Sequence, residues 1–390
     1  MEIAIVGGGY AGVVLARKLA SRIPPTAHVY LIDDTGTHEL QHEIHRVVRD
    51  PAIADDIAFD LKGLLDETTV VDATVTGVDP ETPRITCADG KTFDPTYLVL
   101  CLGAVPATQQ VPGAAEHALS LKSIADAQQI RYAVSDLGPG ARIAVVGAGL
   151  SGVQLAGELA AVNTDLEVTL YEEEETVAPT FPGPFQRAVR QHLDRAGVHV
   201  NTGTRVRQVD SDELRFHDGA PGPFALCLWT GGLAPSPAIG ERPKVYADLR
   251  WDAQTFVLGD AAKVIDRLGR PVPASARTAI EQAEVCATNL GRLAAGPDQL
   301  NFEPRLRQYE MGTATWAVSI GDESVAMVEG TVLTGRAAQM VKTAATARYL
   351  ASIGRRLEAF QIAKHERPRI RSTSGRSRGR RTRCWRPFDA

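Results

Sequence analysis

The 390-residue sequence predicts an α/β protein built from two tandem parallel-sheet domains. First, residues 3–20 (IAIVGGGYAGVVLARKLA) pass from an apolar run through a glycine-rich turn into a helical pattern. Second, residues 141–160 (ARIAVVGAGLSGVQLAGELA) repeat this arrangement. Third, each stretch is followed by another apolar run that ends in acidic residues. A strand, a tight turn and a helix in this order, found twice, predict two Rossmann-like units.

The first glycine motif has the spacing of a pyrophosphate-binding turn. Gly7, Gly9 and Gly12 would provide a tight turn, room for the backbone to approach phosphate, and close packing of helix on strand. The N-terminus of the following helix presents free N–H groups and a positive dipole end to the phosphates. Asp33 lies 21 residues beyond Gly12, where an acid can bind ribose hydroxyls. We therefore expect a dinucleotide at this motif.

The second glycine motif begins 140 residues later. Gly147, Gly149 and Gly152 follow a strand-like run, and Glu172 lies 20 residues beyond Gly152. The acidic run 172–175 lies where the 2′-phosphate of NADPH would bind, and like charges repel. Glu172 itself can accept hydrogen bonds from the ribose hydroxyls of NADH. We therefore expect NADH rather than NADPH here.

The composition is that of an ordinary globular protein, with 44% hydrophobic and 23% charged residues. No apolar run approaches the roughly 20 residues that a membrane-spanning helix needs. The N-terminus shows no basic region with a cleavage site, so we expect an intracellular, cytoplasmic protein. The cysteines contain no C-x-x-C pair, which argues against a disulfide framework, a thiolate zinc site and a dithiol redox centre. They are Cys87, Cys101, Cys227, Cys286 and Cys384.

The net charge of −5 is unevenly distributed along the chain. Residues 364–390 contain ten Lys and Arg against two acidic residues, so the rest of the chain is strongly acidic. An acidic body argues against a nucleic-acid-binding protein. The tail is rich in Arg, Ser and Gly, which predicts a disordered segment. Either it binds anionic lipid headgroups or it has no function.

Three further stretches resemble the two-dinucleotide-binding flavoprotein reductases, in which the second Rossmann unit is inserted into the first. FDPTYLVLCLGAVPA (93–107) resembles the strand and turn where the chain of that superfamily leaves the flavin domain, with Gly103 in the turn. LWTGGLAPSP (228–237) resembles the turn that leaves the nucleotide domain. FVLGDAA (256–262) resembles the late flavin motif, whose aspartate, here Asp260, binds the ribityl chain.

Within this superfamily, the chain resembles the type II NADH dehydrogenases, which are single-subunit NADH:quinone oxidoreductases. The likeness extends over residues 1–363, and three segments carry it. They are LKSIADAQQIR (121–131), PASARTAIEQA (273–283) and WAVSIGDESVAMVEGTVLTGRAA (316–338). The resemblance implies bound FAD, NADH as substrate, a quinone as acceptor, and a peripheral position at the inner face of the cell membrane.

The resemblance also implies domain boundaries and site residues. We expect an FAD-binding domain (1–110 and 245–300), an inserted NADH-binding domain (111–244), a C-terminal α+β segment (301–363), and the basic tail (364–390). The C-terminal segment is expected to contain a hairpin and membrane-associating or dimer helices, and to end in an amphipathic helix. The residues expected to contact FAD are Gly7, Gly9, Ala11, Gly12, Asp33, Val75, Gly103, Asp260 and Ala276. Those expected to contact NADH are Gly147, Gly149, Gly152, Glu172 and Gly231.

Three residues depart from the pattern of the resembled family on the side where the acceptor would bind. Gln154 replaces a usual glutamate after the second glycine motif. Arg277 and Glu281 stand where the family has two glutamines, and only Gln282 is kept. A helix is expected from about Ala274 to Leu290, with its positive N-terminus directed at the flavin. Arg277 either adds to that positive potential or is a surface salt-bridge partner.

The segment THELQHEIHR (37–46) contains the H-E-x-x-H pattern of zinc metalloproteases. It follows the second strand of a dinucleotide-binding unit, so we expect no metal there. In the resembled family this segment runs beside the flavin. His38, His42 and His45 would then share one helical face and, with unperturbed pKa values near 6.5, relay protons to a quinone. His42 and His45 are the candidate catalytic residues of this segment.

The region from Gly335 to Lys364 has a helical pattern. Leu350, Ile353, Leu357 and Phe360 recur at spacings of three and four, and basic residues lie among them. Such an amphipathic helix can lie in a membrane interface. The alternative is a helix that packs on the protein body or on a second subunit of a homodimer.

Three functions remain open from the sequence. The first is an FAD-dependent NADH dehydrogenase that reduces a membrane quinone without pumping protons. The second keeps the transfer of hydride from NADH to flavin but uses a soluble electron-transfer acceptor. The third is a flavin- and NADH-binding protein that senses redox state. The departures at Gln154, Arg277 and Glu281 keep the last two open.

Overall fold

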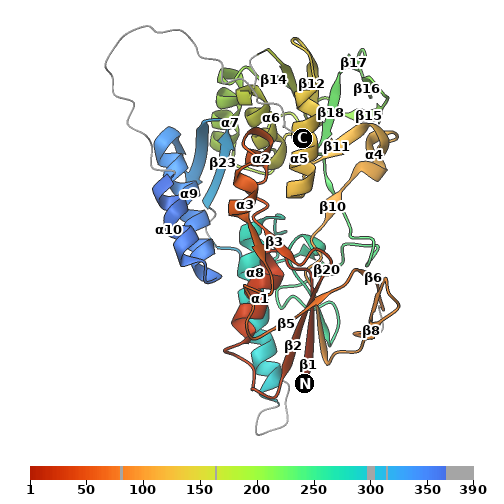
Figure 1. Cartoon of the computed structure of the whole chain (residues 1–390), viewed down its shortest axis with the longest axis vertical. Helices are drawn as coiled ribbons and strands as arrows, with labels where there is room; N and C mark the ends of the chain where they lie inside the picture. Colours follow the sequence, from red (N-terminus) through yellow and green to blue (C-terminus); the bar gives the residue numbers. More distant parts are fainter. Residues whose placement is uncertain (80–81, 163–164, 297–303, 313–314, 366–390) are drawn as a thin grey trace.

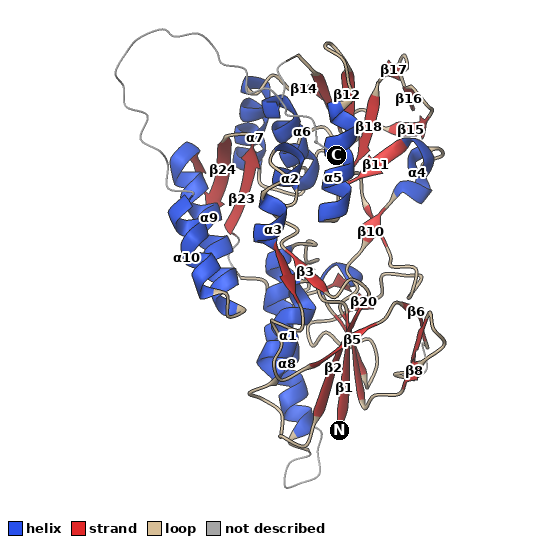
Figure 2. Cartoon of the chain, viewed as in Figure 1, coloured by secondary structure: helices blue, strands red, loops and turns tan. Residues whose placement is uncertain are grey.

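The chain forms two parallel-sheet units and a C-terminal segment that lies beside both (Figure 1). Figure 2 shows the same view by secondary structure. The computed structural model describes residues 1–79, 82–162, 165–296, 304–312 and 315–365. The basic tail expected at 364–390 therefore lies outside the described residues from position 366 onward.

The first sheet carries the first glycine motif. Its parallel strands lie in the order β21-β9-β1-β2-β5. They are β1 (Glu2–Val6), β2 (His28–Asp33), β5 (Thr69–Asp72), β9 (Tyr97–Leu100) and β21 (Thr255–Val257). Helices α1 (Tyr10–Leu19) and α8 (Ala276–Ala294) lie side by side against this sheet. Because β21 follows the second unit in sequence, the first unit is discontinuous.

The second sheet carries the second glycine motif, and its parallel strands lie in the order β11-β18-β12-β13-β14. They are β11 (Ala118–Ser120), β12 (Arg142–Val146), β13 (Glu167–Tyr171), β14 (His199–Asn201) and β18 (Leu226–Trp229). The helices of this unit are α4 (Ala114–His117), α5 (Ile124–Ser135), α6 (Leu150–Val162) and α7 (Gly183–Arg195). The two crossings between the units, β10 (Val105–Pro106) and β19 (Leu233–Ala234), pair antiparallel.

Short elements complete the two units. The first unit adds β3 (Thr37–Glu39), α2 (His45–Arg49), α3 (Ile53–Ile57), β4 (Ala58–Asp60) and an antiparallel sheet of β6 (Val75–Val78), β7 (Ile85–Cys87) and β8 (Thr92–Phe93). The second adds η1 (Thr108–Gln110) and an antiparallel sheet of β15 (Val206–Val209), β16 (Glu213–Phe216) and β17 (Gly222–Pro223). The return segment forms β20 (Lys244–Val245), η2 (Gly259–Ala261) and β22 (Lys263–Val264).

The α/β prediction, with two Rossmann-like sheets, is confirmed. Both central strands, β1 and β12, are apolar throughout their last four residues, and those residues are buried. Parallel strands covered on both faces require such continuous apolar runs. The expected helix near residues 274–290 is α8, which begins after Ser275. The Ser275 hydroxyl accepts a hydrogen bond from the Thr278 amide and so caps the helix.

The C-terminal segment is an antiparallel sheet followed by two helices. The strands are β23 (Thr315–Ile320), β24 (Glu323–Val328) and β25 (Thr331–Thr334), and the helices are α9 (Gly335–Ser352) and α10 (Arg356–His365). Among the described residues, the hydropathy and length of the helices exclude a membrane-crossing segment.

The helical pattern expected from Gly335 to Lys364 forms two helices, because Gly354 divides it into α9 and α10. Gly354 has φ +85°, a left-handed conformation that ends a helix. The Arg355 amide donates to Leu350 O at 2.8 Å, and the Gly354 amide donates to Ala351 O, which closes the turn. Leu350 and Ile353 are consequently buried while Leu357 and Phe360 are exposed, so these four residues form no single apolar stripe.

Helix α6 and the turn between β23 and β24 touch through their backbones. A Cβ atom on Gly157 would lie 2.7 Å from Gly321 N and 2.7 Å from the Ile320 Cα. A side chain at position 157 would therefore force the two elements apart. This contact places the C-terminal sheet directly against the helix that follows the second glycine motif.

Candidate active site

The first glycine loop is shaped to hold a pyrophosphate. A Cβ on Gly12 would lie 1.9 Å from Gly7 O, whereas a Cβ on Gly9 would meet nothing within 4 Å. Gly12 thus allows the close packing of α1 on the loop, and Gly9 leaves open space at the helix N-terminus. No side chain caps that N-terminus, so its amides face the open space. Asp33 accepts hydrogen bonds from the Gly8 amide at 2.6 Å and from the Gly36 amide at 3.0 Å.

The second glycine loop repeats this geometry. A Cβ on Gly152 would lie 1.9 Å from Gly147 O, and Gly149 again faces open space. The buried Glu172 carboxylate accepts from the Ala148 amide at 2.6 Å and from the Glu174 amide at 3.0 Å. A carboxylate has about four lone-pair sites, so Glu172, with these two bonds, retains acceptor capacity for ribose hydroxyls. Asp33 Oδ1 also accepts from the amide and hydroxyl of Thr35, so a ribose hydroxyl would bind at Asp33 Oδ2, which among the described residues accepts only from Gly8. The residues present at both loops therefore fit a dinucleotide.

The loop that carries Asp260 is held from two sides. Gln282 Oε1, buried on α8, accepts a hydrogen bond from the Gly259 amide at 2.7 Å. Arg242 Nε donates to Asp260 O at 2.8 Å, and its Nη2 donates to Ala262 O at 3.3 Å. Sequence patterns had marked Gln282 as the retained family residue. Arg242 belongs to no local motif, so no sequence pattern predicts this role for it.

The other expected contact residues take the following positions in the fold. Ala11 is in the first turn of α1, and Ala276 is the first residue of α8. Val75 begins β6, and Gly231 follows β18. Gly103 follows β9 with φ +64°.

Arg277 and Glu281 form an ion pair on α8, with 2.8 Å between Arg277 Nε and Glu281 Oε1. The buried Tyr309 hydroxyl donates to the other oxygen of Glu281 at 3.0 Å. Burial, and then the charge of Glu281, raise the pKa of the Tyr309 hydroxyl, so Tyr309 remains a donor. Two roles were open for Arg277: adding positive potential at the flavin, or forming a salt bridge. The structure shows the salt bridge.

The three histidines of the 37–46 segment do not share a helix, which corrects that expectation. His38 lies on strand β3, His42 lies in a turn, and His45 begins α2. The segment begins as strand β3, which pairs with β4, and not as a helix. Thr37 lies opposite Asp60, and Glu39 lies opposite Ala58. The two histidines of H-E-x-x-H therefore lack the helical spacing of a zinc protease.

The histidines nevertheless meet side chains from three parts of the chain. His38 Nδ1 lies 2.9 Å from Gly8 O, and its Nε2 lies 2.8 Å from the Tyr349 hydroxyl. Since a carbonyl only accepts, Nδ1 carries the proton and Nε2 accepts from Tyr349. His42 Nδ1 is hydrogen-bonded to the Tyr10 hydroxyl, and its Nε2 lies 2.8 Å from Thr346 Oγ1.

His45 contacts Gln154, the residue after the second glycine motif that differs from the usual glutamate of the resembled family. The Gln154 amide donates to His45 Nε2 at 3.2 Å, and Ser319 Oγ lies 2.9 Å from the same nitrogen. Ser319 Oγ in turn accepts from Lys342 Nζ at 2.8 Å. The structure thus brings Gln154, His42 and His45 together in one assembly, whereas Arg277 and Glu281 pair with each other on α8.

The centre of this assembly is the buried Glu43. Lys342 Nζ lies 3.1 Å from its carboxylate, Arg46 lies 3.2 Å away, and the Thr346 hydroxyl donates to it at 3.3 Å. Burial alone would raise the pKa of Glu43, but the charge of Lys342, followed by His42 and Arg46, holds it well below the usual range. Glu43 is therefore an anion inside the protein.

We call this assembly the interdomain network. It consists of Tyr10, His38, His42, Glu43, His45, Gln154, Ser319, Lys342, Thr346 and Tyr349. Its members come from α1, the 38–45 segment, α6, β23 and α9. It therefore links the two glycine-loop helices and the C-terminal segment.

The expectation of unperturbed histidine pKa values is wrong for two of the three. Burial lowers the pKa of His38 to about 4. Burial, and next the charge of Lys342, lower the pKa of His45 well below its ordinary value. Both rings are therefore neutral at pH 7. Nearby on α6, burial raises the pKa of Glu158 to about 7 although Arg49 Nε lies 2.9 Å from its carboxylate.

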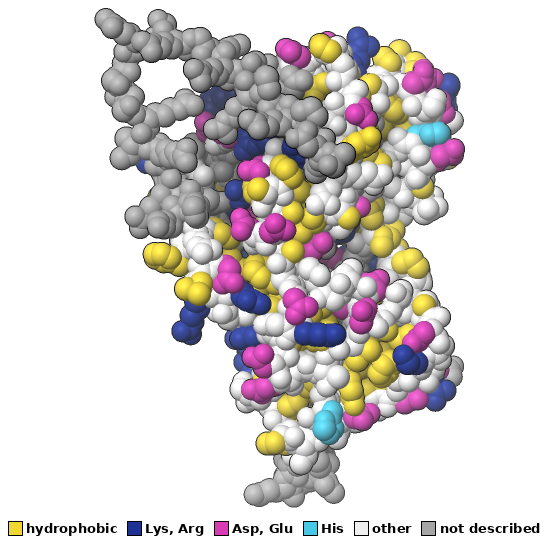
Figure 3. Space-filling view, in the orientation of Figure 1, with side chains coloured by type: hydrophobic (Ala, Val, Ile, Leu, Met, Phe, Trp, Pro, Cys, Tyr) yellow, Lys and Arg dark blue, Asp and Glu magenta, His cyan; other side chains and the backbone are white. Residues whose placement is uncertain are grey.

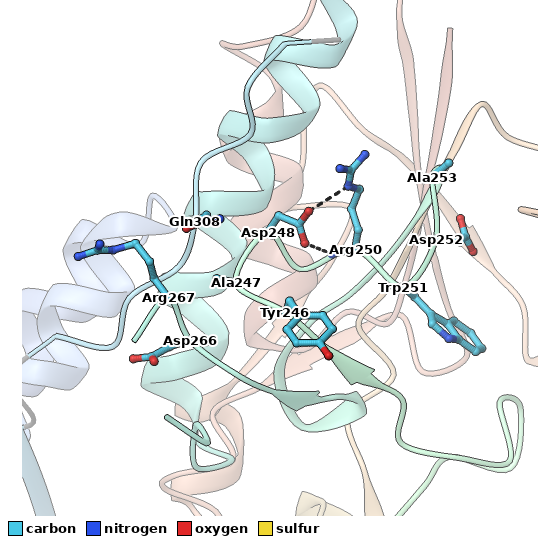
Figure 4. Close-up of a pocket in the computed structure, with 10 residues that line it drawn as sticks. All are labelled: Tyr246, Ala247, Asp248, Arg250, Trp251, Asp252, Ala253, Asp266, Arg267 and Gln308. Carbon is cyan, nitrogen blue, oxygen red and sulfur yellow. Dashed lines mark hydrogen bonds and ion pairs between the residues drawn. The ribbon is translucent and has the colours of Figure 1, made fainter. Parts of the chain in front are cut away.

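A surface groove of about 600 Å³ lies away from both glycine loops (Figure 4). Trp251, Asp252 and Ala253 line it just before β21 begins, whereas Asp260 follows the other end of that strand. In parallel sheets, nucleotide sites lie at the carboxyl ends of the strands. Arg250 and Asp248, which also line the groove, pair with each other at 3.2 Å. None of the expected site residues lines this groove.

Comparisons with known proteins agree with this arrangement. The chain is 25% identical to type II NADH:quinone oxidoreductase of Staphylococcus aureus, over 93% of this chain and 98% of that protein. It is 26% identical to demethylphylloquinone reductase NdbB of Synechocystis, over 80% of this chain and 85% of that protein.

Among solved structures, NDH2 of Plasmodium falciparum in complex with NADH has the same fold. The TM-score is 0.79, with 15% identity over 94% of this chain and 99% of that one. The profile of the pyridine nucleotide-disulphide oxidoreductases matches residues 1–283, well over half of the chain. The likeness to type II NADH dehydrogenases expected from the sequence is therefore confirmed, and the chain belongs to the pyridine nucleotide-disulphide oxidoreductase family.

Proposed function

We propose that this protein is an FAD-dependent NADH dehydrogenase that reduces a quinone at a membrane surface without pumping protons. The observation that carries the proposal is the pair of glycine loops. In each loop, a buried or partly buried acidic side chain accepts a hydrogen bond from a loop amide. Asp33 holds the Gly8 amide and Glu172 holds the Ala148 amide. Two such loops in one chain suit two dinucleotides, one retained as cofactor and one exchanged as substrate.

The residues of the first unit would hold FAD. The amides at the N-terminus of α1 would bind its pyrophosphate, and Asp33 would bind its ribose. Asp260, on the loop fixed by Gln282 and Arg242, would bind the ribityl chain. When bound, FAD supplies the chemistry: it takes hydride from NADH and passes electrons to the acceptor. The loop from Gly147 to Gly152, with Glu172 and Gly231, would hold NADH.

A quinone is the acceptor that the relatives support, since two of them are named as quinone reductases. The family also contains disulphide reductases, which need a reactive cysteine pair. The first cysteine of this chain is Cys87, and burial raises the pKa of Cys101, Cys227 and Cys286. Buried, protonated thiols do not serve as nucleophiles. A soluble electron-transfer acceptor remains the second candidate because Arg277 and Glu281 differ from the family pattern.

The proposal is tested with purified protein. We expect a flavin absorbance spectrum, release of FAD on denaturation, and NADH oxidation with both a soluble quinone and ferricyanide. Turnover with ferricyanide but not with quinones of several head groups would favour a soluble acceptor. A flavin that NADH fails to reduce would leave only a redox-sensing or binding role.

Glu172 is expected to set the preference for NADH over NADPH. Replacing Glu172 by Gln removes the charge that repels a 2′-phosphate and weakens acceptance from the ribose. The ratio of kcat/KM for NADH to that for NADPH should fall about tenfold, the effect of one hydrogen bond to a charged group. Glu167→Gln is the matched control, because Glu167 is an exposed acid on the preceding strand that pairs with Arg142. An unchanged ratio in Glu172→Gln would refute the assignment.

The outer surface of α10 would bind the membrane. Leu357 and Phe360 are 78% and 67% exposed, and Arg348 and Arg356 are the nearby cations of α9 and α10. In Figure 3, apolar side chains protrude beside basic ones at the edge where these helices lie. Exposed large apolar residues with cations suit an anionic lipid surface. A second copy of the chain is the alternative occupant.

Cosedimentation with anionic vesicles tests this surface. Leu357→Ser combined with Phe360→Ser should weaken vesicle binding at least about tenfold, given roughly 1.5–3 kcal/mol per buried apolar side chain. Leu268→Ser is the control, since Leu268 is 53% exposed on the groove-bearing part of the first unit. If the double variant binds vesicles normally but changes from dimer to monomer in solution, the surface is a subunit interface instead.

The 38–45 segment would supply a proton during quinone reduction. The Tyr10 hydroxyl, His42, the Thr346 hydroxyl and Glu43 form a continuous chain of donors that ends at a carboxylate. Burial holds His38 and His45 neutral, and His42 is the histidine that belongs to this chain of donors, so we assign the proton transfer to His42.

We therefore expect the half-reaction with quinone to slow as pH rises from 6 to 8, because quinone reduction takes up protons and their concentration falls. His42→Gln should remove this pH dependence and slow the quinone half-reaction more than the NADH half-reaction. His38→Gln is the matched control and should retain the slope, since the pKa of His38 is about 4. Rapid-mixing kinetics at several pH values distinguish these outcomes. A slope that survives in His42→Gln would exclude the relay.

A further inference from the structure

The C-terminal segment contacts both dinucleotide-binding units through buried polar groups. On the side of the second unit, Ser319 of β23 meets His45 at 2.9 Å and the Gln154 amide at 3.4 Å. Gln154 lies one turn after the N-terminus of α6, the helix that follows the second glycine loop. The close backbone approach at Gly157 fixes the same helix against the same hairpin.

An aromatic contact reinforces this side. The rings of Phe181 and Trp316 meet edge to face with centroids 5.1 Å apart. Phe181 belongs to the loop between the acidic run and α7, and Trp316 belongs to β23. The C-terminal sheet therefore holds two separate parts of the second unit.

On the side of the first unit, α9 reaches the first glycine loop. The Tyr349 hydroxyl donates to His38, whose other nitrogen donates to Gly8 O. The Tyr349 ring also packs edge to face on Tyr10, the first residue of α1, with centroids 4.8 Å apart. Helix α9 thus contacts directly the helix that would hold the cofactor, and it contacts the glycine loop through His38.

Lys342 joins these two sides. Its side chain is only 12% exposed, and its Nζ donates to Ser319 at 2.8 Å and to Glu43 at 3.1 Å. Ser319 leads to α6 through His45 and Gln154, and Glu43 leads to α1 through Thr346, His42 and Tyr10. One buried ammonium therefore lies at the junction between two glycine-loop helices that belong to different units.

We propose that Lys342 is a positioning residue that fixes the distance between the two bound dinucleotides and thereby sets the rate of hydride transfer. This inference rests on the proposed function, since it assigns a role within the same reaction. Hydride transfer requires the two rings to meet within a narrow range of distance and angle, and a misplacement of about 1 Å can cost about a hundredfold in rate. Lys342 does this without touching either dinucleotide.

The chemistry of the junction requires this residue type. A neutral side chain at position 342 would leave Glu43 with Arg46 and His42 as its charged partners and would remove the donor to Ser319. Removing one partner of a buried ion pair is strongly destabilising, mainly because the other charge is left inside the protein without that partner. Relief of that cost would favour separation of α9 from the 38–45 segment, and α6 would move with β23.

The test measures flavin reduction by NADH in a single turnover without oxygen. Lys342→Met should retain FAD and bind NADH within about threefold of the parent protein, yet reduce the flavin roughly ten- to a hundredfold more slowly. The long-wavelength charge-transfer absorbance between NADH and oxidised flavin should weaken, because it reports ring-to-ring contact. Lys342→Arg, which keeps a buried cation, should recover most of the rate. Arg336→Met, an exposed change on the same helix, should match the parent.

Two results would overturn the inference: a parental reduction rate in Lys342→Met, or a loss confined to NADH affinity. If Lys342→Met does not fold, Ser319→Ala removes the bond between the two sides without stranding a charge, and it should slow reduction about tenfold. A parental rate in Ser319→Ala would then reject the proposal.

A second measurement separates this inference from the proposed function. If NADH does not reduce the flavin of the parent protein, the proposed function fails, but backbone amide exchange still tests the junction. Amides of α2 and α6 should exchange faster in Ser319→Ala than in the parent if the C-terminal segment holds the units together. Unchanged exchange would reject the junction itself.

Discussion

The buried carboxylate of Glu43 is the charge on which the assembly of this chain depends. An ionised carboxylate is stable inside a protein only when cations and hydrogen-bond donors surround it. Its partners are Arg46 from its own segment and Lys342 and Thr346 from a helix about 300 residues later. Satisfying this one group therefore requires the first unit and the C-terminal segment to come together, and β23 brings α6 into the same contact.

The sequence predicts the parts of the fold that depend on the spacing of residues close together in the chain. Each glycine motif with its acid needs only residues within about 30 positions, so both loops could be predicted with the roles of Gly7, Gly12 and Gly152. Arg242 and Lys342 could not be predicted, because their partners are fixed by tertiary packing rather than by neighbours in sequence. The division of the C-terminal helix was missed because one residue, Gly354, outweighed a helical periodicity that continued beyond it.

Burial also changes the chemistry that a motif suggests. The spacing of the histidines in the 37–46 segment predicts groups that titrate near neutral pH, but His38 and His45 are buried and remain neutral. Their value to the structure is directional: a neutral imidazole donates at one nitrogen and accepts at the other. His38 uses this property to connect the carbonyl of Gly8 with the hydroxyl of Tyr349, two groups that could not bond to a charged ring in the same way.

The order of segments along the chain governs how the protein can form on the ribosome. Strand β9 ends at Leu100, but its outer neighbour, β21, begins at Thr255, after the whole second sheet. A nascent chain therefore carries an unpaired edge on β9 for roughly ten to thirty seconds at ordinary rates of synthesis. The second sheet, which is continuous in sequence, can fold during this interval. An open apolar edge invites pairing with other chains, so yield in the cell should depend on synthesis speed and on chaperones that shield strand edges.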